Sequence, residues 1–229
     1  MTTEFKARGT TGEIWLYDQI GESFWGDGIS AKAFQKELAG LGKVTTINLR
    51  INSPGGDVFD GLAIYNQLKI HPARKVVDVD GLAASIASIV AMAGDEIRMA
   101  SNAMMMIHNP HGMAIGDSVE MNRVAALLNQ VKGNLVETYA ARTGNARAQL
   151  ETWMDDETWL TAESAVQYGF SDAMTQEQRV SASFNLLSRY RHVPESLRKP
   201  WAKVTPAMRD INAIRIQQQY ERMRAAGAA

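Results

Sequence analysis

The sequence predicts an α/β fold with a mostly parallel β-sheet. Three runs rich in β-branched and apolar residues, at 45–51, 75–80 and 96–99, have the length and pattern of buried strands. The first two runs stop at glycines, near Gly55 and at Gly81, and apolar segments with helical spacing follow them. Strand, glycine turn, helix and strand in this order are typical of βαβ units, which place parallel strands side by side with right-handed crossovers.

The segments before residue 75 form the first of these units. We expect a first strand over 13–20, and a helix that Ser30 caps and that ends near Gly42. The strand at 45–51 then leads through a turn at 52–57 into a second helix. The inner side of this helix is expected to carry Val58, Leu62, Tyr65 and Leu68.

The segments beyond residue 100 add one short strand and several helices. The apolar run 104–107 is expected to form a strand that ends at His108. A long amphipathic helix is expected from about residue 117 to 143, stopped by Gly144, and its length makes it a candidate arm for oligomerisation. Shorter helices are expected over 145–153 and 162–168.

Composition indicates one soluble domain with an appendage. In 229 residues we expect a core domain over 1–175 and a basic, partly helical or disordered C-terminal extension over 176–229. The net charge of −1 argues against nucleic-acid binding, and the absence of cysteine excludes disulfides and thiolate nucleophiles. We find no metal-ligand spacing and expect no cofactor. The longest apolar run, 82–93, is too short for a membrane span and the N-terminus lacks a signal-peptide core, so we expect a cytoplasmic protein.

Ser85 opens a buried helix directly after a buried strand. A serine in that place is either the N-cap of the helix or a nucleophile that the helix N-terminus assists. His108 ends a further strand, and the two side chains can meet because reactive groups gather where parallel strands end. Near neutral pH an imidazole can take the serine proton and return it to a leaving amine. The pair predicts nucleophilic catalysis, with a carboxylate that orients the imidazole.

The turn at 52–57 supplies what an acyl-transfer enzyme also needs. Its two glycines, Gly55 and Gly56, let the backbone pass close to a ligand and aim free amides at it, although a tight turn with positive φ would need the same residues. We expect the N–H groups of Gly56 and Ile86 to form an oxyanion hole, and Gly55 to contact the substrate.

Four motifs, in order, resemble the ClpP family of serine peptidases, peptidase family S14. They are Ile51–Gly56, Gly81–Ser85, Met106–Pro110 and Trp159–Asp172, within a similarity that covers roughly residues 13–174. The resemblance implies a ClpP/crotonase-like fold of stacked βαβ units with a long protruding helix, and self-assembly into a ring or stacked rings. It makes Ser85 the nucleophile and His108 the general base. Gly56 and Ile86 would form the oxyanion hole, and Gly112, in the tract after His108, would contribute to substrate binding.

The third member of the triad departs from the family's pattern. The family's aspartate lies two positions before the aromatic residue that corresponds to Trp159, and here that position holds Glu157. Glu157 is the first choice for the acid that orients His108. Asp156 and Asp155 remain alternatives, because a small shift of the chain could bring either to the same place.

The extension after residue 176 makes the chain similar to ClpP-related proteases of phages and prophages, which cut scaffold and head proteins during capsid maturation. On that resemblance the chain is a serine endopeptidase that acts on scaffold or capsid proteins, in the host cytoplasm or the procapsid. One alternative is the proteolytic subunit of an ATP-dependent Clp-type protease that works with an AAA+ unfoldase. A crotonase-fold enzyme for acyl-coenzyme A and an inactive ring scaffold are further alternatives, which the Ser85 and His108 pair disfavours.

Overall fold

The chain divides into two compact units, residues 1–192 and 193–229. The computed structural model describes residues 3–21, 28–177, 187 and 190–198. In the second unit the described residues include a short helix, α7 (Glu195–Arg198). Most of the predicted extension over 176–229 lies outside the described residues, but residues 187 and 190–192 belong to the first unit.

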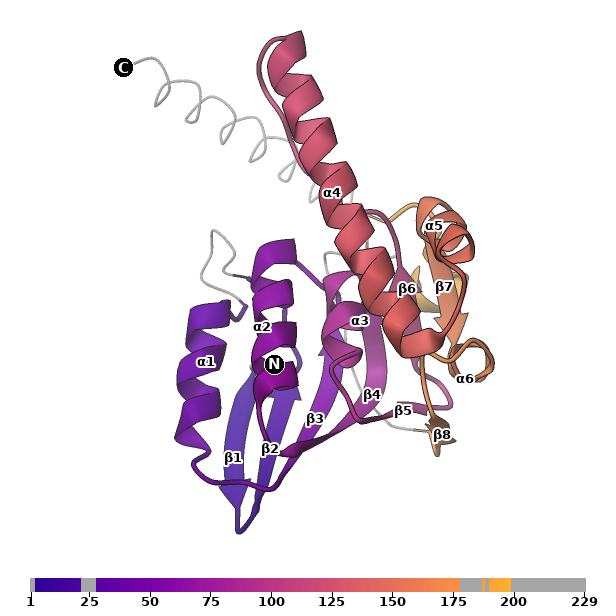
Figure 1. The fold of residues 1–229 in the computed structure, drawn as a ribbon. Helices are drawn as coiled ribbons and strands as arrows, with labels where there is room; N and C mark the ends of the chain where they lie inside the picture. The colour runs from indigo at the N-terminus through magenta and orange to yellow at the C-terminus, as the bar shows by residue number, and fades with distance from the viewer. Residues whose placement is uncertain (1–2, 22–27, 178–186, 188–189, 199–229) are drawn as a thin grey trace, which may run out of the picture. The chain divides into compact units, whose positions relative to one another are not determined.

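A β-sheet forms one layer of the first unit (Figure 1). Its strands in the described part of the chain are β1 (Glu4–Arg8), β2 (Thr11–Leu16), β3 (Thr46–Ser53), β4 (Arg74–Ala84), β5 (Glu96–Ala100), β6 (Met104–Ile107), β7 (Thr158–Thr161) and β8 (Ala173–Thr175). Neighbouring strands follow the order β1-β2-β3-β4-β5-β8, and β6 pairs with both β4 and β7. The β1–β2 and β6–β7 pairs are antiparallel and the others parallel, which confirms the predicted α/β fold with a mostly parallel sheet.

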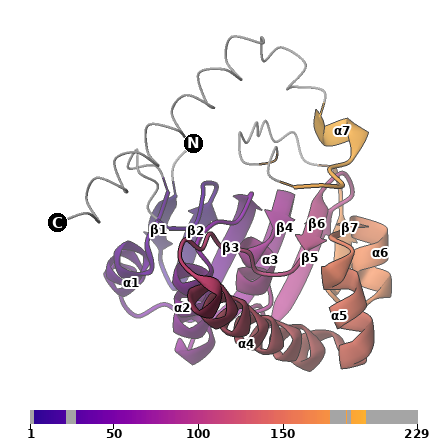
Figure 2. The same ribbon diagram turned by 90° about the horizontal axis from the view of Figure 1, so that it is seen from above.

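Helices cover one face of this sheet, as Figure 2 shows for α1 to α4. The helices of the first unit in the described residues are α1 (Ala31–Gly40), α2 (Val58–Ile70), α3 (Ile86–Ala91), α4 (Ser118–Thr143), α5 (Arg147–Asp155) and α6 (Ala162–Gln167). Ser30 caps α1 as predicted, because its side chain accepts a hydrogen bond from the Ala33 N–H. Every residue of α3 is buried, so the core of the unit surrounds the helix that Ser85 precedes.

The long helix α4 also begins and ends where the sequence predicts. The Asp117 carboxylate accepts hydrogen bonds from the first-turn amides of Val119 and Glu120, and Gly144 ends the helix in the left-handed conformation. The buried residues of α4, Val131, Leu135, Val136 and Tyr139, all lie in its C-terminal half. Its N-terminal half extends beyond the sheet (Figure 1). Among the described residues, neither α4 nor any other helix combines the length and apolarity that a membrane span requires.

Strand β4 departs from the sequence prediction. The β-branched run was expected to stop at Gly81, but β4 continues to Ala84 because its last three residues pair with β6. This second partner strand supplies the backbone hydrogen bonds that residues 82–84 need, so their low intrinsic strand propensity does not end the strand. Ser85 therefore follows β4 without an intervening loop.

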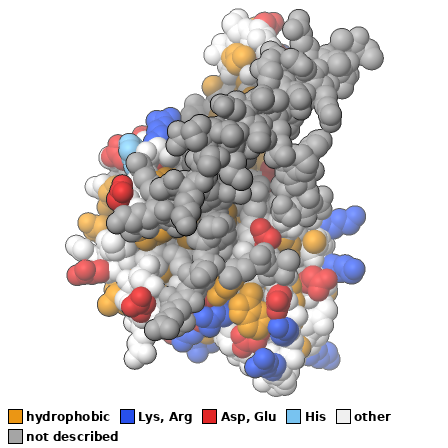
Figure 3. Space-filling view, turned by 180° about the vertical axis from the view of Figure 1, so that it is seen from behind, with side chains coloured by type: hydrophobic (Ala, Val, Ile, Leu, Met, Phe, Trp, Pro, Cys, Tyr) orange, Lys and Arg blue, Asp and Glu red, His pale blue; other side chains and the backbone are white. Residues whose placement is uncertain are grey.

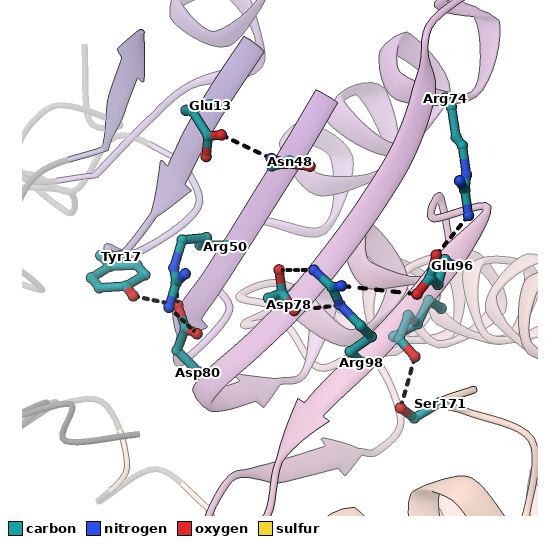
Figure 4. A network of polar contacts seen from close by, with 11 residues as sticks. Glu13, Tyr17, Asn48, Arg50, Arg74, Asp78, Asp80, Glu96, Arg98 and Ser171 are labelled. Carbon is teal, nitrogen blue, oxygen red and sulfur yellow. Dashed lines mark hydrogen bonds and ion pairs between the residues drawn. The ribbon is translucent and has the colours of Figure 1, made fainter. Parts of the chain in front are cut away.

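The sheet face opposite the helices carries paired charges (Figure 4). Arg50 on β3 donates two hydrogen bonds to Asp80 on β4, at 2.8 and 2.6 Å, and the Tyr17 hydroxyl donates to the same carboxylate. Arg98 on β5 donates two to Asp78, at 2.8 and 2.7 Å. Figure 3 shows acidic and basic side chains next to one another among the described residues visible from this side. Bidentate pairs of this kind tie β3, β4 and β5 together just before β4 reaches the site.

Candidate active site

Ser85 lies at a sharp turn between β4 and α3. Its φ of 56° and ψ of −131° are unusual for a residue with a side chain. The Ser85 hydroxyl does not cap α3, so the N-cap interpretation is wrong for this side chain. Instead, the Ser85 Oγ lies 2.7 Å from the His108 Nε2, which is a hydrogen-bond distance. The structure thus brings together the two side chains that the sequence analysis paired across 23 positions.

Two buried hydroxyls hold the backbone of this turn. The Ser88 Oγ donates a hydrogen bond to the Ser85 carbonyl oxygen at 2.5 Å and lies 2.7 Å from the Tyr139 hydroxyl. Because the single Ser88 proton is committed to the carbonyl, the Tyr139 hydroxyl is the donor in the second bond. Tyr139 comes from α4 and is 1% exposed. The chain of hydrogen bonds therefore connects the long helix to the residue that carries the candidate nucleophile.

His108 lies directly after β6 and has the electrostatics of a neutral base. Burial, together with the nearby His111 and Arg191, lowers the pKa of His108 to about 4, while the Glu157 charge acts in the opposite direction. The ring centroids of His108 and His111 are 5.3 Å apart. At pH 7 the His108 imidazole is thus uncharged, and with Ser85 as donor its Nε2 is the acceptor.

Glu157 is buried, with a left-handed backbone at φ 52°. Its carboxylate accepts hydrogen bonds from the backbone N–H groups of Arg191 at 2.9 Å and His192 at 2.7 Å, and from the Trp159 indole at 3.3 Å. Burial opposes ionisation, but these donors outweigh it and lower the pKa of Glu157. None of its hydrogen bonds within the described residues comes from His108. The carboxylate acts on the imidazole as a fixed negative charge.

Of the two alternative acids, Asp155 is bound to other side chains and Asp156 is exposed. The Asp155 carboxylate accepts hydrogen bonds from the Asn109 side chain at 2.6 Å and from Lys132 on α4 at 2.5 Å, and both donors lower the pKa of Asp155. Asp156 is exposed, and its backbone oxygen lies 2.9 Å from the His192 Nδ1. Of the three acids that the sequence offered, Glu157 is the one whose charge bears on His108.

Of the two glycines of the turn, Gly55 packs against Ser85 and Gly56 packs against Ile20. Gly55 has a φ of 87°, and a Cβ there would lie 2.7 Å from the Ser85 Cβ and 3.3 Å from the Ile86 nitrogen. Ile20 donates its N–H to the Gly55 oxygen and accepts the Asp57 N–H. Because these bonds lie on either side of Gly56, the Gly56 N–H points away from Ile20. Gly56 and Ile86 both line the cavity that Ser85 faces, whereas Gly55, which was expected to contact the substrate, packs on Ser85 and is not among the described residues that line the cavity.

A cavity of about 370 Å³ opens beside Ser85 and His108. Its walls are largely apolar and come from α3 and α4, with Ile89, Leu128, Val131 and Leu135 among them. Gly112, predicted to contribute to substrate binding, lines the cavity from the loop before α4. In the described part of the chain no group of three or more His, Asp or Glu side chains is placed to hold a metal ion.

Sequence reasoning missed the residues that surround His108 and Glu157. The Tyr190 ring packs edge-to-face against His108, with centroids 5.2 Å apart, and its hydroxyl donates to the Pro54 oxygen at 2.6 Å. Tyr190 lies 82 positions after His108, in a part of the chain that was predicted to be an appendage. No motif or periodicity marks it.

Comparison with known proteins finds a family match within the first unit of the chain. The model of the Clp protease family matches residues 14–178. The chain is 32% identical over 161 residues to the ATP-dependent Clp protease proteolytic subunit 1 of Leifsonia xyli, covering 69% of this chain and 80% of that protein. It is 33% identical over 159 residues to proteolytic subunit 3 of Rhodococcus jostii, covering 69% and 76%. A solved structure of a ClpP1 mutant from Listeria monocytogenes has the same fold, with a TM-score of 0.63 at 23% identity over 72% of this chain and 91% of that one.

Proposed function

The chain belongs to the Clp protease family and is a serine-type peptidase, and we propose that it cleaves peptide bonds with Ser85 as nucleophile and His108 as general base. The observation that carries this proposal is the 2.7 Å hydrogen bond between the two side chains at the rim of a cavity. Glu157 serves as the acid of the triad, through its charge and not through a direct hydrogen bond to the imidazole.

The proposed reaction begins when the Ser85 Oγ attacks the substrate carbonyl carbon while the His108 Nε2 takes the hydroxyl proton. The N–H groups of Gly56 and Ile86 stabilise the oxyanion of the tetrahedral intermediate, and each such donor contributes roughly 3 to 4 kcal/mol. The imidazolium then gives its proton to the leaving amine. Water hydrolyses the acyl-enzyme by the same steps, with His108 again as base.

The shape and lining of the cavity indicate the substrate. Apolar side chains from α3 and α4 surround a space of about 370 Å³ next to Ser85, enough for one large aliphatic or aromatic side chain. Burial of such a side chain is worth about 1.5 to 3 kcal/mol. We therefore propose an endopeptidase that cuts unfolded protein chains after apolar residues.

For the cellular role we propose a proteolytic subunit that assembles into a ring and acts in the cytoplasm with an ATP-driven unfoldase. The similar proteins from Leifsonia xyli and Rhodococcus jostii are ATP-dependent Clp protease proteolytic subunits, which supports this role. So does the exposed apolar surface on the N-terminal half of α4, where Val119, Met121 and Leu127 are available for contacts between subunits. The extension after residue 176 favours a second candidate, the maturation of phage scaffold or capsid proteins.

Labelling with a fluorophosphonate tests the proposed chemistry. This reagent reacts with a serine hydroxyl that a neighbouring base activates, so we expect one covalent label per chain, at Ser85. Mass spectrometry of the digested protein locates the label. Labelling of a different serine, or none under conditions in which the protein is folded, would rule out Ser85 as nucleophile.

A comparison of substrates distinguishes the two cellular roles. The role with an unfoldase predicts that an AAA+ unfoldase and ATP accelerate the hydrolysis of a stably folded protein, while short peptides are cut without either. The phage role predicts that scaffold or capsid protein is cut at the same rate with and without ATP. Gel electrophoresis of time courses reads out both.

The dependence of activity on pH follows from the low pKa of His108. The base form is lost as pH falls through the pKa, which lies at about 4, well below the ordinary value of 6.5. We expect the acid limb of kcat/KM for a peptide to have its midpoint near pH 4, so that the enzyme keeps most of its activity at pH 5.5. A midpoint at 6.5 or above would show that the imidazole is not desolvated.

A further inference from the structure

The segment 190–192 contacts three separate parts of the candidate active site. The Tyr190 ring packs on the His108 imidazole, and its hydroxyl donates to the Pro54 oxygen, in the turn that carries Gly55 and Gly56. The backbone N–H groups of the next two residues, Arg191 and His192, donate to Glu157. A stretch of three residues thus contacts the base, the turn of the oxyanion hole and the acid.

We infer that Tyr190 is a positioning residue for catalysis, which holds the His108 imidazole against Ser85 and fixes the turn at Pro54 in the geometry that the oxyanion hole requires. The inference rests on the proposed function of Ser85 and His108. It assigns part of the C-terminal extension to the active site, where the sequence alone placed the end of the peptidase domain at residue 175.

The placement of the segment indicates support of the site and not blockage. The described residues that line the cavity run from Gly56 to Tyr139, so Tyr190 does not occupy the space beside Ser85. The Ser85–His108 hydrogen bond is intact with Tyr190 in contact with the imidazole. A segment that inhibited the enzyme would fill the cavity or separate the pair.

The ring and the hydroxyl of Tyr190 have different effects. An aromatic ring edge-to-face on an imidazole limits its rotation and excludes water from one side of it. The hydroxyl ties that ring to the Pro54 oxygen, so the base and the turn are held by one side chain. Because a misplacement of about 1 Å can cost a factor of about 100 in rate, loss of the whole side chain should affect turnover strongly.

Two substitutions separate these effects. We expect Tyr190→Ala to lower kcat for peptide hydrolysis about 100-fold with KM changed less than about twofold, since the cavity is untouched. Tyr190→Phe keeps the ring and should lose only about 3- to 10-fold in kcat, the range that corresponds to one hydrogen bond. Tyr168→Phe, which removes a hydroxyl from a ring that packs on Trp153, is the matched control and should retain the original kcat.

The titration of His108 provides a readout that a merely structural role of Tyr190 would not move. The groups that bear on this imidazole are His111, Glu157 and Arg191, and burial has the largest effect. Removal of the Tyr190 ring admits water, so in Tyr190→Ala the pKa of His108 should rise by about one unit or more toward 6.5, and Tyr190→Phe should leave it unchanged. NMR of labelled histidines measures this pKa without any substrate.

The two Tyr190 variants together test whether this residue positions His108. A 100-fold loss of kcat with a raised His108 pKa in Tyr190→Ala, largely restored in Tyr190→Phe, supports positioning. Unchanged or increased kcat in Tyr190→Ala, or a loss with the His108 pKa unmoved, overturns it. If Tyr190→Ala does not fold, an unchanged kcat in Tyr190→Phe overturns the role of the hydroxyl and a loss of about 3- to 10-fold supports it. Failure of the proposed function would differ, because the unsubstituted protein would then neither take the Ser85 label nor cut peptides.

Discussion

Replacement of His108 by alanine is expected to lower kcat/KM for peptide hydrolysis by about 10⁴-fold or more, and Ser85→Ala should have an equal effect. The two side chains share one hydrogen bond, and neither can perform the proton transfer without the other. The double variant should therefore be no worse than either single variant. The increase in fluorescence as a fluorogenic peptide is cut measures the residual rate of each variant, and circular dichroism shows whether the variant is folded.

His71→Ala is the matched control for this experiment. His71 lies at the C-terminal end of α2, about 20 Å along the helix from the residues of α2 that line the cavity. The substitution removes an imidazole from the same unit but leaves Ser85, His108 and Glu157 unchanged. The value of kcat/KM should therefore stay within about twofold of that of the unsubstituted protein. Retention of more than a hundredth of the activity in His108→Ala would mean that another group is the base.

Gly55→Ala is expected to lower both stability and activity. A Cβ at this position would lie 2.6 Å from the Ala84 oxygen and 2.7 Å from the Ser85 Cβ, closer than real Cβ contacts allow, and the φ of 87° adds roughly 1 to 2 kcal/mol of strain for a residue with a side chain. Relief of these contacts requires the turn or the backbone at Ala84 and Ser85 to move, which changes the position of the Ser85 hydroxyl relative to His108. We expect a loss of about 100-fold or more in kcat/KM and a lower Tm in thermal unfolding.

Gly133→Ala provides the control for a glycine substitution. Gly133 lies within α4, where a Cβ would meet nothing within 4 Å, so alanine should raise stability by about 0.5 to 1 kcal/mol through its higher helix propensity. Activity should not change. If Gly55→Ala were as stable and active as the unsubstituted protein, Gly55 would not determine the position of the nucleophile.

The fold and the central pair of the site could be predicted from sequence for a physical reason. Strands that alternate with helices leave few arrangements, and the carboxyl ends of parallel strands meet at one edge. Ser85 follows β4 and His108 follows β6, and these two strands are neighbours. Their side chains therefore meet within hydrogen-bond distance.

The environment of Glu157 could not be predicted, because its partners are mainly backbone N–H groups. Every residue except proline carries such a group, so residue type gives no signal at Arg191 or His192. The contact of Tyr190 with Pro54 spans 136 positions, which no local pattern reports. The extension of β4 beyond Gly81 was missed for a related reason, since it depends on pairing with β6.

The backbone of Ser85 has a consequence for how such a chain evolves. Its φ of 56° costs about 1 to 3 kcal/mol that glycine at the same position would not incur. Selection for heat tolerance and selection for turnover therefore act in opposite directions on a single codon. In a duplicated gene whose product no longer needs the nucleophile, substitution of Ser85 by glycine would raise the stability of the fold.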